Sequence, residues 1–284
     1  MTVLKTKTAK KWLSKSVNYC DNRGGCYNNF DTRIGVYVIN CKMHKVRYNK
    51  LLKYAKEADV KVCRSPCVLG KKFSSKEIYN MVNDKFLSKN SDMTKVEVSI
   101  NMSHYNTWRK LLNSCNDYAL ILEDDVELHD DFIDKINLIM NTLDEENISF
   151  SILHLWNGNW GRTKHAQKKV IKIDKDITIM QEKKSYNAGA VAYIISKSYA
   201  KWLINHFFPI KIPQDILIGN YPSRGKHLTL KMKWDKKDNC YKSPIFDMEC
   251  GGEGGTGSQT TQTYDAPIIK EIYKDYINKL KKKK

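Results

Sequence analysis

The chain has 284 residues, of which 41% are hydrophobic, so it can bury a core and is not an intrinsically disordered protein. No apolar run reaches the roughly 20 residues that a membrane-spanning helix needs, and the N-terminus lacks the apolar segment of a secretory signal peptide. We therefore expect a cytoplasmic protein whose eight cysteines are reduced thiols.

Positive charge is concentrated at the two ends of the chain. The 49 Lys and Arg residues exceed the 31 Asp and Glu residues by 18, and residues 1–32 and 266–284 together supply nine of these charges. Such charge blocks are usually solvated and flexible, and an anionic partner is the alternative. A nucleic-acid-binding protein more often carries a basic stripe on its folded body. Since the sequence also has no nucleic-acid motif, nucleic acid is not the expected partner.

The first half of the chain alternates strand and helix signals. Residues 34–41 form a nearly continuous apolar run rich in β-branched residues, which is typical of a strand in a parallel sheet. A helical pattern follows, and residues 60–62 form a short second strand. Two more helices are predicted at capping boxes, in which Ser74 and Thr94 are each followed three residues later by Glu.

The next buried strand is expected at residues 118–122, and it runs directly into an acidic cluster, Glu123-Asp124-Asp125. Asp130 or Asp131 can cap the helix that follows. Later strands are predicted at residues 150–155, 188–195 and 228–234, and Ser198 is expected to cap a short helix. Strands that alternate with helices predict an α/β fold with a mostly parallel sheet.

The acidic cluster lies at the end of a strand, where open α/β sheets present their ligand-binding groups. Three consecutive carboxylates repel one another unless a cation or hydrogen-bond donors compensate them. Mg²⁺ and Mn²⁺ prefer oxygen ligands and often use one or two carboxylates together with substrate phosphates. The alternative is that the acids only begin an exposed turn, but Asp130 and Asp131 already supply the acids of the next helix start. On position alone, the divalent-metal site and the exposed turn both stay open.

Five sequence blocks resemble glycosyltransferase family 25, which contains bacterial lipopolysaccharide galactosyltransferases and collagen galactosyltransferases. The similarity covers roughly residues 34–249. The blocks are Val38-Ile39-Asn40 with Arg47 downstream, Glu97 through Ser103-His104 to Trp108, residues 120–126, residues 189–196 followed by Ala200, and Pro213-Gln214-Asp215. The chain departs from the family pattern at Ser99 and Asn101, where the family usually has glycine and another small residue.

This resemblance implies a GT-A fold with a Rossmann-like domain that binds a nucleotide sugar. We expect this domain at residues 33–264, between a basic extension at 1–32 and a basic amphipathic tail at 265–284. The implied reaction is an inverting, metal-dependent transfer of galactose or glucose from a UDP-sugar to a glycan or protein-linked acceptor. Asp125 would bind Mn²⁺ or Mg²⁺, while Glu123 and Asp124 would position the ribose and nucleotide.

The same blocks supply candidates for donor binding and for the catalytic base. The candidate donor-binding residues, besides the two acids, are Asn40, Arg47, Ser103 and His104. An arginine can clamp a phosphate through two hydrogen bonds, although Arg47 can also be a solvated helix residue and His104 a satisfied, partly buried histidine. Inverting transfer needs a base for the proton of the acceptor hydroxyl. Asp215 is the first candidate, and Asp247 and Glu249 are weaker ones.

Three features outside the blocks leave alternatives open. The loop with Trp156 and Trp160 can stack on sugars or cover the edge of the core. The glycine-rich residues 251–257 can form a mobile lid or be disordered. After Asp265, a possible cap, and Pro267, the apolar face of the last helix can pack on the core or lie on an anionic membrane. Two other functions also remain open, namely binding of a polyanion such as nucleic acid, and a degenerate transferase fold used as a scaffold.

Overall fold

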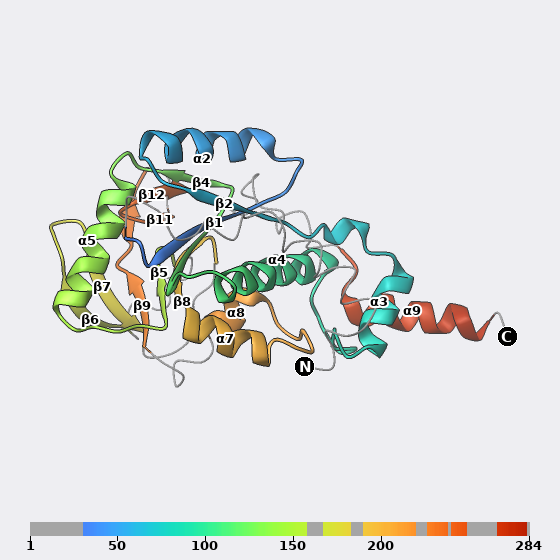
Figure 1. The fold of residues 1–284 in the computed structure, drawn as a ribbon. Helices are drawn as coiled ribbons and strands as arrows, with labels where there is room; N and C mark the ends of the chain where they lie inside the picture. The colour runs from blue at the N-terminus through green and yellow to red at the C-terminus, as the bar shows by residue number, and fades with distance from the viewer. Residues whose placement is uncertain are drawn as a thin grey trace.

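The computed structural model describes residues 31–157, 167–182, 190–219, 226–237, 240–248 and 266–282. These residues form an α/β fold around an eight-stranded sheet with the strand order β2-β1-β3-β8-β5-β9-β7-β6 (Figure 1). Helices cover both faces of this sheet, which confirms the predicted fold class.

The first half of the sheet is parallel. Its strands are β1 (Ile34–Asn40), β2 (Val62–Pro66) and β3 (Tyr118–Glu123), and helix α2 (Lys45–Glu57) connects the first two. All seven residues of β1 are buried, as expected for a central parallel strand. β2 begins at Val62 rather than at residue 60, because the amide of Val60 donates to the carbonyl of Ala55 and closes the turn after α2 (2.7 Å).

The second half of the sheet is largely antiparallel. Its strands are β5 (Ile152–His154), β6 (Gln167–Lys172), β7 (Thr178–Glu182), β8 (Ala192–Ser196) and β9 (His227–Leu230). Only β5 and β9 are parallel there, while β8 is antiparallel to both β3 and β5. The sequence analysis missed the β6–β7 hairpin, because β6 is polar and has no buried residue from which a buried-strand signal could arise.

Both predicted capping boxes are confirmed. Helix α3 (Ser75–Asn83) begins after Ser74, whose amide donates to Glu77 Oε2 (2.9 Å) while its Oγ accepts from the Glu77 amide (3.2 Å). Thr94 and Glu97 make the same pair of contacts before α4 (Lys95–Leu112). In each box, two backbone amides at the helix start, which would otherwise lack acceptors, donate to side-chain oxygens.

Of the other predicted helix caps, Asp131 occupies the N-cap position without a capping hydrogen bond, and Ser198 was wrong. Asp131 precedes α5 (Phe132–Glu145), but its carboxylate pairs with Lys135 (2.9 Å) rather than capping the helix. Ser196 caps α7 (Lys197–His206) in place of Ser198, since its Oγ accepts from the Tyr199 amide (3.3 Å). The remaining elements are η3 (Gly70–Lys72), β4 (Val126–Leu128), α8 (Gln214–Gly219), β10 (Lys233–Asp235), β11 (Cys240–Lys242), β12 (Phe246–Met248) and α9 (Ile269–Lys281).

Two hydrophobic cores lie on opposite faces of the sheet. Alternate residues of β1 point to opposite faces, so Tyr37 and Ile39 join one core while Val36 and Val38 join the other. The first core is built largely around α4 and α7, and the second packs under α2 and α5 (Figure 1). α4 contributes the largest fully buried side chain, Trp108.

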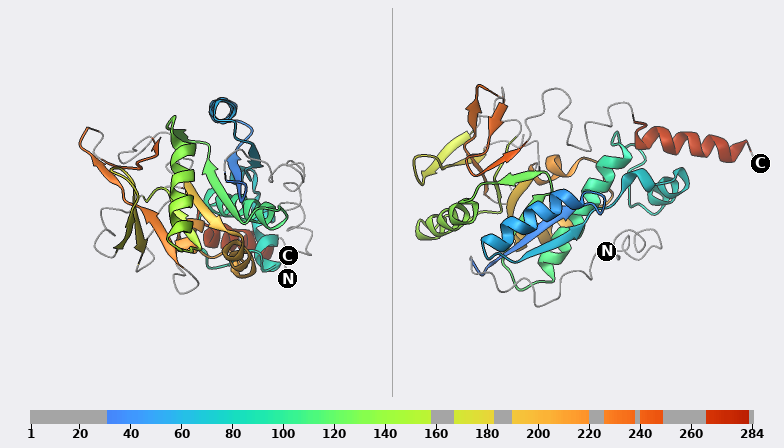
Figure 2. Two further views of the ribbon diagram at one scale, coloured as in Figure 1. Left: turned by 60° about the vertical axis from the view of Figure 1, so that its left-hand side comes forward. Right: turned by 90° about the horizontal axis from the view of Figure 1, so that it is seen from above.

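Helix α9 packs on the core through its first turns. It begins at Ile269, two residues after Pro267, while Asp265 lies outside the described residues. Ile269 and Ile272 are buried, and the rings of Tyr273 and Tyr276 lie 5.7 and 5.2 Å from that of Tyr79 on α3. These contacts support core packing for this part of the helix. The last turn projects away from the rest of the fold (Figure 2), and Leu280 there is exposed.

The expectation of reduced cysteines was wrong. Cys41 and Cys67 form a disulfide, with their Cα atoms 4.9 Å apart, and Cys63 and Cys115 are also disulfide-bonded. The pairing of β1 with β2 places Asn40 opposite Pro66, so the residues that follow the two strands come within bridging distance. The expectation of reduced thiols rested only on the expected cellular compartment and took no account of which cysteines lie close together in the fold.

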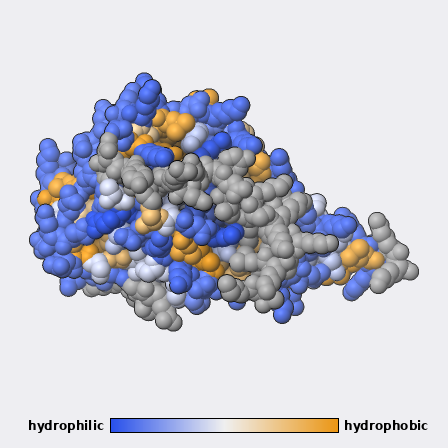
Figure 3. All heavy atoms as spheres, in the orientation of Figure 1, coloured by the Kyte–Doolittle hydropathy of each residue, from blue (hydrophilic) through white to orange (hydrophobic). Residues whose placement is uncertain are grey.

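On the face shown in Figure 3, the described residues are mostly hydrophilic, and the hydrophobic ones lie in small separate groups. Among the described residues, none of the helices combines the length and the hydropathy that crossing a bilayer requires.

Candidate active site

The carboxyl ends of three parallel strands bring the acidic cluster together with residues of the first block. β3 ends at Glu123, and Asp124 and Asp125 form the turn before β4. Ile39 of β1 pairs with Glu123, so Asn40 lies beside the cluster. The site therefore occupies the edge at which an open α/β sheet binds its ligands.

Asp124 is held by an amide and a guanidinium. Asn40 Nδ2 donates to Asp124 Oδ2, and Arg47 Nη1 lies 3.5 Å from Asp124 Oδ1. Arg64, the central residue of β2, donates from Nη2 to Asn40 Oδ1, and its guanidinium lies over the ring of Tyr48. Two arginines thus lie beside the cluster, as a site for a phosphorylated ligand requires.

Sequence reasoning found Arg47 but missed Arg64. Arg64 is the central residue of the short strand β2, and its contact with Asn40 depends on the pairing of β2 with β1, which has no local sequence signal.

Asp125 carries the least compensated charge of the site. Burial, together with the charges of Glu123 and Asp124, raises its pKa from the ordinary 3.8 to about 7, although Arg47 opposes the shift. Within the described part of the chain, Asp125 Oδ1 is buried and has no hydrogen-bond partner. An unpartnered buried carboxylate oxygen fits a cation, which would favour the ionised form.

The protein by itself offers few metal ligands here. In the described ranges, no group of three or more His, Cys, Asp or Glu side chains converges on a point that could hold a metal ion. Mg²⁺ and Mn²⁺ can bind through one or two carboxylates when substrate phosphates complete the coordination. The geometry therefore fits an ion that binds together with a phosphorylated ligand.

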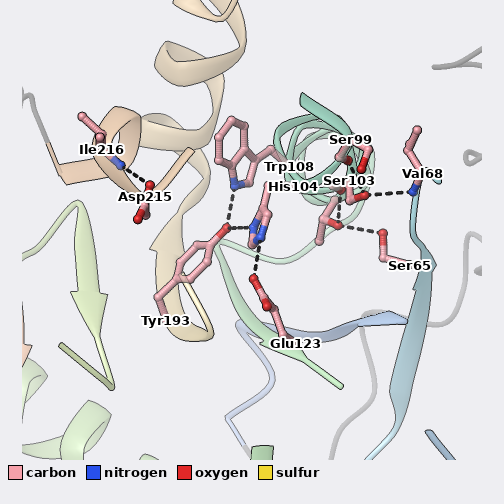
Figure 4. Close-up of polar contacts among 11 residues, drawn as sticks. Ser65, Val68, Ser99, Ser103, His104, Trp108, Glu123, Tyr193, Asp215 and Ile216 are labelled. Carbon is pink, nitrogen blue, oxygen red and sulfur yellow. Dashed lines mark hydrogen bonds and ion pairs between the residues drawn. The ribbon is translucent and has the colours of Figure 1, made fainter. Parts of the chain in front are cut away.

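Glu123 is the end of a buried chain of hydrogen bonds (Figure 4). Trp108 Nε1 lies 2.9 Å from Tyr193 Oη, which lies 2.9 Å from His104 Nδ1, and His104 Nε2 lies 3.2 Å from Glu123 Oε1. An indole N–H can only donate, so Trp108 donates to Tyr193, and the Tyr193 hydroxyl retains its own proton to donate to His104 Nδ1. In that arrangement His104 donates from Nε2 to Glu123, and the carboxylate is held as an acceptor.

The structure places Ser103 and His104 inside the protein rather than on the open face of the site. His104 is fully buried, and Ser103 Oγ donates to the Ser99 carbonyl (2.7 Å) and accepts from the Val68 amide (2.9 Å). One turn later, Thr107 shares a hydrogen bond with Ser65 of β2 (2.7 Å). The polar residues of this block therefore fasten α4 to the strand ends (Figure 4).

Asp215 lies on a separate element, α8, and its Oδ1 accepts from the Ile216 amide (2.8 Å; Figure 4). Asn101, one of the departures from the family pattern, donates from α4 to the Ile212 carbonyl just before this helix (2.7 Å). The buried Asn101 thus anchors the segment that carries Asp215.

Two of the remaining sequence candidates, Asp247 and Trp156, lie within the described residues. Asp247 lies on β12, 3.3 Å from His129, and Trp156 packs partly buried against the second core, which supports the interpretation that it covers the core edge. Glu249, Trp160 and residues 251–257 lie outside the described residues.

The comparisons with known proteins all match glycosyltransferases. Residues 33–218 match the family model described as glycosyltransferase family 25, lipopolysaccharide biosynthesis protein. A procollagen galactosyltransferase 2 from Homo sapiens is 23% identical over 175 residues, which is 60% of this chain and 27% of that protein. A glycosyltransferase 25 family member from Anopheles gambiae is 25% identical over 202 residues, which is 66% of this chain and 32% of that protein. The chain thus spans about a third or less of the length of these relatives.

Proposed function

Because the chain belongs to glycosyltransferase family 25, we propose that it transfers galactose or glucose from a UDP-sugar to a hydroxyl of a glycan or protein-linked acceptor. The observation that carries the proposal is the buried, unpartnered Oδ1 of Asp125 beside two further carboxylates at a sheet edge. The galactosyltransferase named among the relatives supports the choice of sugar. The α/β sheet with its parallel first half is compatible with the GT-A arrangement.

The residues fit a divalent cation. Asp125 would hold Mn²⁺ or Mg²⁺, which would neutralise the charge that develops on the departing nucleotide diphosphate. Arg47, a third exposed beside Asp124, can bind a phosphate of the donor. Glu123, held as an acceptor by His104, can receive hydrogen bonds from ribose hydroxyls.

Inversion requires a base on the acceptor side, and we assign this role to Asp215. Its carboxylate sits at the start of a short helix that Asn101 anchors to α4, and it remains partly exposed. It would accept the proton of the attacking hydroxyl.

The first test is a donor screen. The protein is incubated with Mn²⁺ and each UDP-sugar in turn, and UDP release is measured with and without candidate acceptors. Asp125→Asn keeps the shape of the side chain but removes its charge, so it should abolish metal-dependent donor binding while the circular dichroism spectrum is unchanged. Full activity in EDTA, or in this variant, would disprove the metal role.

The second test concerns the base. Asp215→Asn should leave donor affinity nearly unchanged and lower turnover by about 10²-fold or more, the usual contribution of a general base. Loss of donor affinity with normal turnover would instead place Asp215 in the nucleotide site. The anomeric configuration of the first product, measured by NMR, tests inversion directly.

The cytoplasmic location expected from the sequence stays a prediction. The Cys41–Cys67 disulfide argues against a reducing compartment, because such bonds persist mainly in oxidising environments.

A further inference from the structure

A depression of about 450 Å³ lies outside the acidic cluster, between the β10–β11 hairpin and the β4–β12 pair. It is lined by the hairpin, by His129 just after β4, and by residues 243, 244 and 247 in and before β12. Neither the donor nor the metal, as proposed above, occupies it.

One wall of the depression is an exposed aromatic ring. Trp234 of β10 is 49% exposed, although most large hydrophobic side chains of the fold are buried. Tyr241 faces it across the hairpin and packs edge-on, with the ring centroids 4.8 Å apart at 64°. This contact holds the indole in place, so binding a ligand on its face requires little further ordering.

The charged groups around the ring are mostly paired. Lys233 binds Asp176 (2.6 Å), Lys242 binds Asp235 (2.8 Å), and His129 Nε2 lies 3.3 Å from Asp247. An anion would have to compete with these carboxylates. A neutral ligand rich in hydroxyls could instead donate to the carboxylates and accept from the lysines.

The depression is joined to the acidic cluster by one short strand. His129 follows Asp125 by four residues through β4, at most about 13 Å at roughly 3.3 Å per residue. On the facing strand, Asp247 pairs with Glu127. An acceptor that reacts at the acidic cluster could therefore extend to Trp234.

We propose that this depression binds a neutral saccharide unit of the acceptor, remote from the reacting hydroxyl, with the sugar ring stacked on Trp234. A sugar ring has an apolar C–H face and polar edges, which match an aromatic wall within a polar rim. The acceptor role rests on the proposed function, whereas saccharide binding does not. Remote contacts of this kind provide binding energy that can support turnover.

The test measures glycan binding by the full chain without a donor. Wild type, Trp234→Ala, Trp234→Phe, Lys236→Ala and Leu138→Ala are applied to an array of neutral, sulfated and phosphorylated oligosaccharides. Leu138→Ala is the matched control, because Leu138 is an exposed large hydrophobic side chain on α5 outside the depression, whereas Lys236 lines the depression and its removal tests for an anionic ligand. We expect neutral glycans to be retained, with affinity reduced about tenfold or more in Trp234→Ala and largely restored in Trp234→Phe. Leu138→Ala should bind as wild type does.

Three results would overturn the proposal. They are no retention of neutral glycans, equal retention by Trp234→Ala with wild-type unfolding behaviour, or retention of anionic glycans alone with loss in Lys236→Ala. UDP release from each UDP-sugar by the wild-type protein, measured without any acceptor, tests the transferase proposal independently of the saccharide site. If Trp234-dependent glycan binding occurs without release from any UDP-sugar, the transferase proposal fails and the saccharide site stands.

Discussion

Removal of the Tyr193 hydroxyl tests the hydrogen-bond chain that ends at Glu123. Tyr193→Phe keeps the ring but leaves Trp108 Nε1 without an acceptor and His104 Nδ1 without a donor, and both residues are fully buried. Each buried polar group that loses its partner costs about 1–3 kcal/mol, so for two groups we expect the free energy of unfolding to fall by about 2–6 kcal/mol. For a chain of this size, that corresponds to a decrease in Tm of roughly 3–10 °C.

The variant should also weaken donor binding. Without Tyr193, the His104 proton is no longer confined to Nε2, and Glu123 loses its fixed donor for part of the time. Groups that orient a binding residue typically contribute 10- to 100-fold at metal sites, so we expect the Kd for the donor to rise about tenfold. Isothermal titration with the donor, with Mn²⁺ present, measures this change separately from turnover.

Trp108→Phe provides the control. It removes the donor to Tyr193, so the double variant leaves only His104 without its partner. The two changes should therefore be less destabilising together than the sum of the single effects, by about 1–2 kcal/mol. Additive effects on Tm, or a Tyr193→Phe variant as stable as wild type, would refute the assigned chain of donors and acceptors.

Further expectations concern acid stability, the Asp215 segment and the last helix. Burial, with a smaller contribution from His227, lowers the pKa of His154 from 6.5 to about 3, so the neutral imidazole stabilises the fold above pH 6.5 and this stability is lost as the pH falls towards 3. His154→Leu should reduce the pH dependence of the unfolding free energy in that window by up to about 1.4 kcal/mol per pH unit, and an unchanged slope in urea denaturation would contradict the assignment. Asn101→Ala should lower turnover more than donor affinity, because it frees the Ile212 carbonyl before α8; an equal loss in both quantities would argue against a local effect. Deletion of residues 266–284 should lower Tm, since burial of each of the two isoleucines at the start of α9 contributes about 1.5–3 kcal/mol. Sedimentation of the full chain, but not of the truncated one, with phosphatidylserine vesicles at low salt would support an anionic-membrane role, and failure of the full chain to bind would remove it.

The sequence by itself predicted the elements whose signals are local. Capping boxes at Ser74 and Thr94 depend only on contacts within four residues, and both helices begin there. The buried strands β1 and β3 were recognised because residues covered on both faces leave a continuous apolar run. The acidic cluster at the end of β3 follows from the same signal.

Only the tertiary structure decided which distant residues meet the acidic cluster. The roles of Tyr193 and Arg64 depend on strand order and register, and the Cys41–Cys67 disulfide on the pairing of β1 with β2, none of which has a local sequence signature. His104 looked equally suited to a ligand contact or to the interior, and the packing of α4 against the sheet placed it inside. The physical reason is that local patterns report which face of a segment is buried, whereas partners and pKa values depend on which other segments cover that face.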